Sequence, residues 1–260
     1  MEPAILATYD RPVPRYTSYP TAAQFDFSVG PRQHAEWLGD LRSGEAALYL
    51  HVPFCRQLCW YCACHTMVMR REGTLDTYAA ALERELTLLA GIAPDFMVGS
   101  MQWGGGTPTQ LGATRLRAVG RLVDSLFDRR CGAEISMEVD PRYCDEATVD
   151  AMADLGVTRV SLGVQDFDGA VQRAINRMQS FETTLATLER VRRAGMRKIN
   201  LDLVYGLPSQ TLDTLARTLD LALALAPDRF AVFGYAHVPW MKPHQKLIPS
   251  ETLPDAAARA

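Results

Sequence analysis

Six short apolar runs alternate with amphipathic stretches along most of the chain, and this alternation limits the fold more than any other feature of the sequence. The apolar runs cover residues 46–54, 98–103, 134–140, 159–165, 198–205 and 229–236. Two of the intervening stretches end before Gly156 and Gly195, a residue type that often follows the last turn of a helix. Repeated strand–helix units with short links predict a parallel sheet, either doubly wound or curled into a full or partial barrel.

The two faces of the predicted strands differ in polarity. One face is apolar, as in Leu48, Leu50 and Val52. The other face is polar and carries residues such as Tyr49, His51, Ser100, Gln102, Ser136, Glu138, Asp140, Ser161, Gln165, Asn200 and Asp202. A doubly wound sheet is apolar on both faces, and a closed eight-stranded barrel fills its interior with Val, Ile and Leu. The sequence therefore predicts an α/β fold, a partial (β/α)6 open TIM-like barrel whose polar concave face lines a ligand cavity.

Three segments are expected along the chain. Residues 1–44 form an N-terminal arm or lid, residues 45–240 form the barrel core, and residues 241–260 begin a C-terminal region without another strand–helix pattern. The opening MEPAILATYD lacks the basic and apolar regions of a secretory signal, and the longest uncharged run, residues 96–114, contains three consecutive glycines and a proline. We therefore expect a cytoplasmic protein without a membrane span.

The charge balance limits the class of partner. The 260 residues include 27 lysines and arginines against 30 acids, which gives a net charge of -3. Such a balance offers no electrostatic attraction for nucleic acid or an anionic membrane. We expect the chain to be a monomer that binds a small molecule.

Four of the six cysteines fall within ten residues. Cys55, Cys59 and Cys62 form a C-x3-C-x2-C pattern after the first predicted strand, and Cys64 follows. This clustering favours metal binding over a disulfide framework. A [4Fe-4S] cluster normally takes four thiolates, so three would leave one iron free for a substrate or cofactor. A structural zinc site, with Cys64 or His65 as the fourth ligand, is the alternative.

The remaining two cysteines, Cys131 and Cys144, stand apart in the sequence. Nothing in their spacing groups them with each other or with the cluster. We expect both to be ordinary thiols without a ligand role.

The segment CRQLCWYC, with an aromatic residue before its last cysteine, resembles the signature of radical S-adenosylmethionine enzymes. Six further motifs follow the order of the predicted strands: YLHVPFC, WGGGTPT, MEVDPR, SLGVQDF, NLDLVYGLP and YAHVP. Together with PRYTSYPT near the N-terminus and the extra Cys64, they resemble the oxygen-independent coproporphyrinogen III oxidase (coproporphyrinogen dehydrogenase) family. The resemblance runs from about Tyr9 to Pro249.

This resemblance implies the cofactors and the residues that bind them. Cys55, Cys59 and Cys62 would hold a 4Fe-4S cluster, and S-adenosyl-L-methionine would bind its free iron, with two molecules of that cofactor used in the family. The positions that match the family's cofactor contacts are Tyr49, Tyr61, Gly105, Gly106, Thr107, Glu138, Gln165, Arg177, Asp202 and Ala236. No catalytic side chain is implied beyond the cluster and cofactor. Phe233 is expected either to stack on adenine or to belong to the core, and His51 either to support the site or to be structural.

The resemblance also implies an activity in haem biosynthesis. A 5'-deoxyadenosyl radical would take a hydrogen from the β-carbon of a propionate of coproporphyrinogen III, and loss of carbon dioxide and an electron would leave a vinyl group. Two such steps give protoporphyrinogen IX. The partners would be this substrate and an unidentified electron donor and acceptor. Arg15 and Arg142 are predicted to meet the substrate carboxylates.

Family enzymes carry a further, mostly helical C-terminal domain that these 260 residues lack, so we expect the chain to fall short of full activity. One alternative is a related haem chaperone, although Cys64 and PRYTSYPT favour the oxidase. The other alternative is an inert or zinc-binding truncated core.

Overall fold

The fold consists of one parallel β-sheet and the helices that connect its strands. The computed structural model describes residues 5, 8, 21, 24–41, 44–71, 73–93 and 95–259. The strands of the sheet are β1 (Glu45–Val52), β4 (Met97–Gly105), β5 (Arg129–Val139), β6 (Arg159–Gln165), β7 (Lys198–Tyr205) and β8 (Arg229–Gly234). They pair in this order, all in parallel, with β1 at one edge and β8 at the other. The predicted open, six-stranded arrangement is confirmed.

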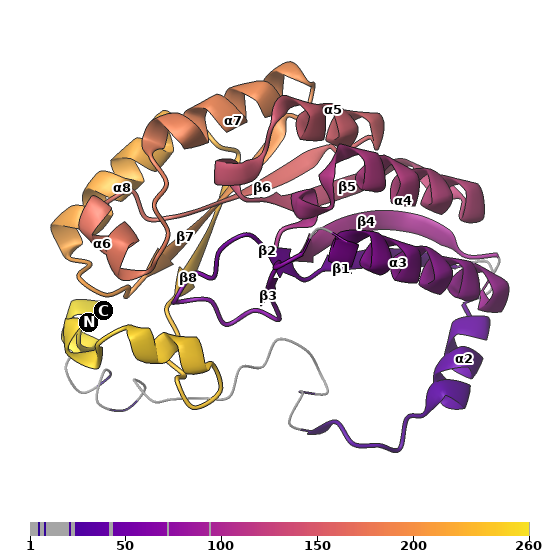
Figure 1. The fold of residues 1–260 in the computed structure, drawn as a ribbon, viewed down its shortest axis with the longest axis horizontal. Helices are drawn as coiled ribbons and strands as arrows, with labels where there is room; N and C mark the ends of the chain where they lie inside the picture. The colour runs from indigo at the N-terminus through magenta and orange to yellow at the C-terminus, as the bar shows by residue number, and fades with distance from the viewer. Residues whose placement is uncertain are drawn as a thin grey trace.

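The helices lie along the outer, convex side of the curved sheet (Figure 1). They are α3 (Gly73–Ile92), α4 (Gly112–Leu126), α5 (Glu146–Asp154), α7 (Phe181–Arg193) and α8 (Leu212–Ala224), with the shorter α6 (Gly169–Ala174), α2 (Pro31–Gly39) and α9 (Ala256–Arg259) near the ends of the arc. Short 3-10 turns cover Pro108–Leu111, Pro141–Tyr143, Pro243–Leu247 and Ser250–Thr252. Within the described part of the chain, none of the helices has the length and apolar character needed to cross a membrane.

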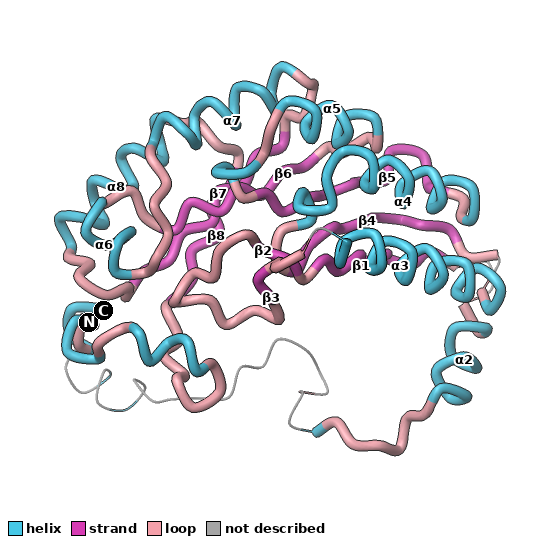
Figure 2. Tube along the Cα trace, viewed as in Figure 1, coloured by secondary structure: helices cyan, strands magenta, loops and turns pink. Residues whose placement is uncertain are grey.

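A long loop carrying β2 (Phe54–Cys55) and β3 (Met67–Val68) lies on the inner side of the sheet, opposite the helices (Figure 2). We call it the cysteine loop. The two short strands pair in parallel with each other and form a separate two-stranded sheet. This loop leaves β1 at its C-terminal end, so the cysteines that it carries stand over the end of the sheet where parallel α/β folds place their sites.

Local sequence sets where several helices begin and end. The side chain of Asp145 accepts a hydrogen bond from the amide of Thr148 and so caps α5, and Ser180 caps α7 in the same way. Gly156 and Gly195 follow α5 and α7 with φ values of 72° and 90°, a conformation that glycine adopts without steric cost. The predicted helix ends at these two glycines are confirmed.

The two faces of the sheet differ as the sequence predicts. The apolar face is packed under the helices, and Leu50, Trp103 and Leu162 are at most 2 % exposed. On the inner face, polar side chains bond to one another across strands, and Ser161 Oγ donates to Asp202 Oδ2 at 2.9 Å. The sheet therefore offers a continuous polar surface on the side that carries the cysteine loop.

Two sequence predictions were wrong in detail. The first predicted strand does not run unbroken to Phe54, because Pro53 has no amide hydrogen to continue the ladder. β5 begins at Arg129, five residues before the predicted start, in an exposed segment without apolar alternation. Within the segment predicted as an arm, Pro31–Gly39 forms a helix with proline at its first turn. Arg15 and most of PRYTSYPT lie outside the described residues.

Candidate active site

The cysteine loop brings three thiols to the same end of the sheet. Cys55 ends β2, and Cys59 and Cys62 follow in the loop; Cys59 is buried, whereas Cys55 and Cys62 are half-buried. Burial raises the pKa of the Cys55 thiol to about 11, and charge on Cys62 and Cys59 adds to the rise. The three thiols are thus close enough to influence one another electrostatically. Among the described residues, no three His, Cys, Asp or Glu side chains already converge as ligands of a single metal ion.

The thiol of Cys62 is more acidic than an ordinary cysteine. Hydrogen bonds from Cys64, followed by one from Thr66, lower its pKa to about 6, against the effect of burial. A thiolate is the form of cysteine that binds metals. The fourth cysteine of the cluster, Cys64, is exposed and lies beside Cys62 rather than apart from it.

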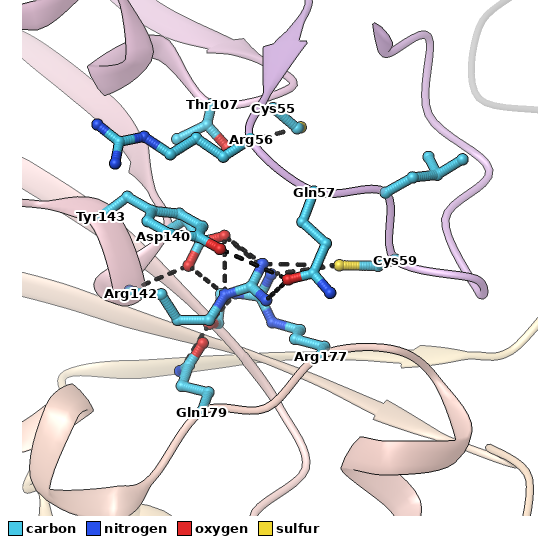
Figure 3. A network of polar contacts seen from close by, with 12 residues as sticks. Cys55, Arg56, Gln57, Cys59, Thr107, Asp140, Arg142, Tyr143, Arg177 and Gln179 are labelled. Atoms are coloured by element: carbon cyan, nitrogen blue, oxygen red, sulfur yellow. Dashed lines mark hydrogen bonds and ion pairs between the residues drawn. The ribbon is translucent and has the colours of Figure 1, made fainter. Parts of the chain in front are cut away.

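Beside Cys59 lies a buried network of charged side chains (Figure 3). Asp140 pairs with Arg142 at 2.7 Å and with Arg177 at 3.1 Å, and all three side chains are at most 9 % exposed. Burial raises the pKa of Asp140, but the two guanidinium groups outweigh it and hold the pKa below its usual value. Arg142, which the sequence predicts as a substrate ligand, is held in this buried ion pair.

Arg177 reaches this network from the segment after α6. Its Nη2 donates to the carbonyl of Gly163 at 2.7 Å, beside the side chain of Gln165. Its Nε is buried without a hydrogen-bond partner, as is Oε1 of Gln179 nearby. Buried polar atoms without partners are uncommon in folded proteins, and each calls for an explanation such as strain, a functional role or a bound water or ion. Gln165 is held with φ at 71°, which is unusual outside glycine. The predicted positions Arg177 and Gln165 are brought together here.

The glycine segment at the end of β4, residues 104–106, is tightly enclosed. A Cβ on Gly106 would lie 2.6 Å from the carbonyl oxygen of Pro53, and one on Gly105 would meet the ring of His51 at 2.7 Å. The amide of Gly105 donates to Glu138 Oε2 at 3.1 Å, and that of Gly106 donates to the carbonyl of Val52 at 2.8 Å. Glycine is therefore required here because the chain after β1 passes close by. The sequence motif alone does not reveal this reason.

Two predicted cofactor contacts flank the first glycine of this segment. A Cβ on Gly104 would lie 3.0 Å both from the ring of Tyr49 and from Oε1 of Glu138. Tyr49 is 52 % exposed, and its hydroxyl lies 3.1 Å from Nδ1 of His51. Burial raises the pKa of Glu138, and the neighbouring Asp202 raises it further. These side chains form a polar patch beside the cysteine loop, with His51 supporting Tyr49.

The other predicted positions fall around the same loop. Thr107 is buried with its hydroxyl 3.8 Å from Cys55 Sγ. Tyr61 packs against the apolar cluster beneath α6, and burial raises the pKa of its phenol. The carbonyl of Ala236 accepts from Gln245 at 3.2 Å, whereas Phe233 is 51 % exposed on β8. Exposure removes Phe233 from the core and leaves it available for stacking.

The segment after β8 holds the cysteine loop in place. Gln245 is fully buried and donates to the carbonyl of Tyr61 at 2.9 Å. His244 Nε2 lies 2.7 Å from the carbonyl of Cys62, and Lys242 Nζ donates to that of Cys64 at 2.9 Å. Sequence reasoning missed these three residues. The single available signal was a histidine and a lysine beside a proline in YAHVPWMKPHQK, which is too general to assign a partner.

A second group of anchors also went unrecognised. Gln57 Nε2 donates to Asn176 Oδ1 at 2.8 Å, and Asn176 Nδ2 donates to the carbonyl of Leu58 at 2.9 Å. Asn176 itself has φ at 55°. The cysteine loop is thus fixed from two sides, by the segment after α6 and by the segment after β8.

Comparison with known proteins gives concordant matches. The model of the radical SAM superfamily matches residues 49–222. The chain is 46 % identical over 256 residues to the oxygen-independent coproporphyrinogen III oxidase of Paracoccus denitrificans, covering 98 % of this chain and 57 % of the relative. It is 48 % identical over 249 residues to the protein of the same name from Bradyrhizobium diazoefficiens, covering 95 % and 55 %.

A solved structure agrees with these sequence matches. Coproporphyrinogen III oxidase (HemN) from Escherichia coli, described as a radical SAM enzyme, superimposes with a TM-score of 0.91 at 37 % identity, over 98 % of this chain and 58 % of the other. The chain thus spans a little over half the length of the relatives that it matches.

Proposed function

Because the chain belongs to the radical S-adenosylmethionine superfamily, we propose that it carries the cofactor-binding half of an oxygen-independent coproporphyrinogen III oxidase. The observation that carries this proposal is the match at 46 % identity over 98 % of the chain to a protein of that name. Superfamily membership itself implies a 4Fe-4S cluster and S-adenosylmethionine. In this proposal the core spans residues 45–240, with an arm before it and a further region after it.

The residues present fit a cluster. Three thiols stand on one loop, the Cys62 thiol is acidic, and Arg177, whose Nε is buried without a partner, lies with its Nη1 3.6 Å from Cys59 Sγ. When bound to Cys55, Cys59 and Cys62, the cluster would supply the electron that cleaves S-adenosylmethionine. The chain's own residues would hold and orient the cluster. Gln245 and Asn176 fix the cysteine loop, and this loop covers the inner face and limits access of water to the buried charges.

The polar patch beside the loop fits an adenosine-containing cofactor. Glu138 on β5 offers a carboxylate oxygen, Tyr49 on β1 an exposed ring and Asp202 on β7 a second carboxylate, all on the polar inner face of the sheet. A carboxylate is suited to accept hydrogen bonds from ribose hydroxyl groups. In this proposal, S-adenosylmethionine binds over this patch. The proposal also includes a second molecule of the cofactor, as the family resemblance implies.

The proposed substrate is coproporphyrinogen III. Conversion of a propionate to a vinyl group releases carbon dioxide and requires removal of a hydrogen atom and one further electron, so an electron acceptor must take part. Arg142 is engaged with Asp140, so it does not offer a free cation to the substrate carboxylates. We therefore expect residues other than Arg142 to meet the substrate carboxylates.

Anaerobic reconstitution of the chain with iron and sulfide tests the proposal. We expect brown protein that converts S-adenosylmethionine to 5'-deoxyadenosine in the presence of dithionite. A second assay adds coproporphyrinogen III and follows its decarboxylation. Colourless protein that retains zinc would contradict it. Tight haem binding without cleavage of the cofactor would indicate a haem chaperone instead.

Replacing Glu138 with glutamine should weaken binding of S-adenosylmethionine to the reconstituted protein by roughly 10- to 100-fold, because a hydrogen bond to a charged group is lost. The amide oxygen of glutamine can still accept from Gly105, so the glycine segment stays in place. Isothermal titration calorimetry measures the affinity.

The matched control is Glu134→Gln on the same strand and the same face. Glu134 lies four residues before Glu138, in the middle of β5, and pairs with Arg159 and Lys198. We expect this variant to bind the cofactor with unchanged affinity. Equal affinity in the two variants would remove Glu138 from the cofactor site.

A further inference from the structure

Two guanidinium groups point at the sulfur of one predicted cluster ligand. Arg177 Nη1 lies 3.6 Å from Cys59 Sγ, and Arg142 Nη2 lies 3.8 Å from the same atom. Both distances suit N–H donation to sulfur, which is a larger and softer acceptor than oxygen. Cys59 is also the buried member of the three cysteines, so these donors act where water does not compete.

The charges in this network do not cancel. Asp140 is one carboxylate between two cations, and all three side chains are at most 9 % exposed. The two guanidinium groups also hold the pKa of Asp140 below its usual value, so the carboxylate is ionised at neutral pH. One uncompensated positive charge therefore remains beside the sulfur, in an environment that screens it less than solvent does.

Arg142 is held in this position from several sides. Its Nε donates to Asp140 Oδ1 at 3.0 Å and its Nη2 to Oδ2 at 2.7 Å, a two-point contact with the carboxylate. Its Nη1 donates to Gln57 Oε1 at 3.4 Å, and the guanidinium carbon lies 5.1 Å from the ring centre of Tyr143. A side chain so constrained presents Nη2 to Cys59 in a defined direction (Figure 3).

We propose that Arg142 raises the reduction potential of a 4Fe-4S cluster bound through Cys59, by its charge and by donating an N–H to the ligand sulfur. Hydrogen bonds to cluster sulfurs and nearby charge are established determinants of cluster potential. This inference rests on the proposed function, since it requires the cluster. Arg142 acts through Cys59 and is a positioning residue, distinct from the residues that touch S-adenosylmethionine.

Arg142 is a better probe than Arg177. Loss of Arg142 leaves Asp140 paired with Arg177 at 3.1 Å, so no buried carboxylate is left alone. Loss of Arg177 would also remove the hydrogen bond to the carbonyl of Gly163. Breaking a buried charge network completely is strongly destabilising, and Arg142→Gln avoids this.

The experiment is a redox titration of the reconstituted protein without S-adenosylmethionine, with the reduced cluster followed by electron paramagnetic resonance. At a fixed solution potential, Arg142→Gln should lower the ratio of reduced to oxidised cluster about tenfold, which equals ~59 mV for a one-electron couple. Arg142→Lys keeps the charge and should recover part of the shift. The control Arg117→Gln removes the same charge from an exposed pair with Asp154 and should leave the potential unchanged.

The outcomes separate this inference from the proposed function. Iron and sulfide content is measured first, and a parent protein that forms no cluster overturns both. Equal potentials in parent and Arg142→Gln, at equal cluster content, overturn the role of Arg142 alone. If Arg142→Gln does not fold, Arg142→Lys decides, because loss of the two-point contact should still lower the potential relative to the parent; no change would count against the proposal.

Discussion

Replacing Cys55 with alanine should abolish both iron retention and formation of 5'-deoxyadenosine. A cluster held by three thiolates has no spare protein ligand, so loss of one leaves a site that does not hold the metal. The measurements are iron and sulfide content after anaerobic reconstitution, and 5'-deoxyadenosine by liquid chromatography. The expected loss is complete within the detection limit of both.

Two matched variants make the result specific. Cys131→Ala removes an exposed thiol on β5, and Cys64→Ala removes the exposed cysteine next to Cys62. Both should keep iron binding, whereas a four-ligand zinc site that used Cys64 would lose its metal in that variant. Iron retention by Cys55→Ala at the level of the parent would show that these thiols do not form the cluster site.

Gly106→Ala should displace the cysteine loop and destabilise the protein by about 1–3 kcal/mol, the usual cost of forcing a methyl group into a packed site. The added Cβ would lie 2.6 Å from the carbonyl oxygen of Pro53 and 2.8 Å from that of Phe54. Both atoms belong to the backbone directly before Cys55, so they cannot rotate away as a side chain would. Urea unfolding measures the stability, and iron content after reconstitution reports the displacement of the loop.

Gly91→Ala is the control for this change. Gly91 lies in α3, and a Cβ there would meet nothing within 4 Å. In a helix, alanine is favoured over glycine by about 1 kcal/mol or less, so this variant should be as stable as the parent or slightly more stable. A Gly106→Ala protein with the stability and iron content of the parent would show that the glycine segment does not constrain the loop.

The strand–helix architecture could be predicted from the sequence because the pattern of apolar and polar residues is periodic. Alternation of apolar and polar residues placed Leu50 and Asp202 on opposite faces, and both were found there. The prediction of strand boundaries failed where this periodic pattern is absent. The first residues of β5, from Arg129, are exposed and pair with β4 alone, and their own sequence carries no alternation.

The site was predicted unevenly for a related reason. Residues within motifs, such as Glu138 and Arg177, were identified by resemblance, and the structure brings them near the cysteine loop. Arg142 was predicted to meet the carboxylates of the substrate, and its contact with Cys59 was not predicted, because an isolated arginine after a strand gives no indication of its partner. Its contact with Cys59 joins residues 83 positions apart, and such pairs leave no pattern in a single sequence.

The anchoring of the cysteine loop has a consequence for synthesis of the protein. Lys242 and Gln245 bond to carbonyl groups 178 and 184 residues earlier in the chain. At ~5–20 residues per second on the ribosome, roughly ten to forty seconds separate the two parts. During that interval the thiols have been made but lack these contacts, so a nascent chain exposes them to stray metals and oxidants before the loop is fixed.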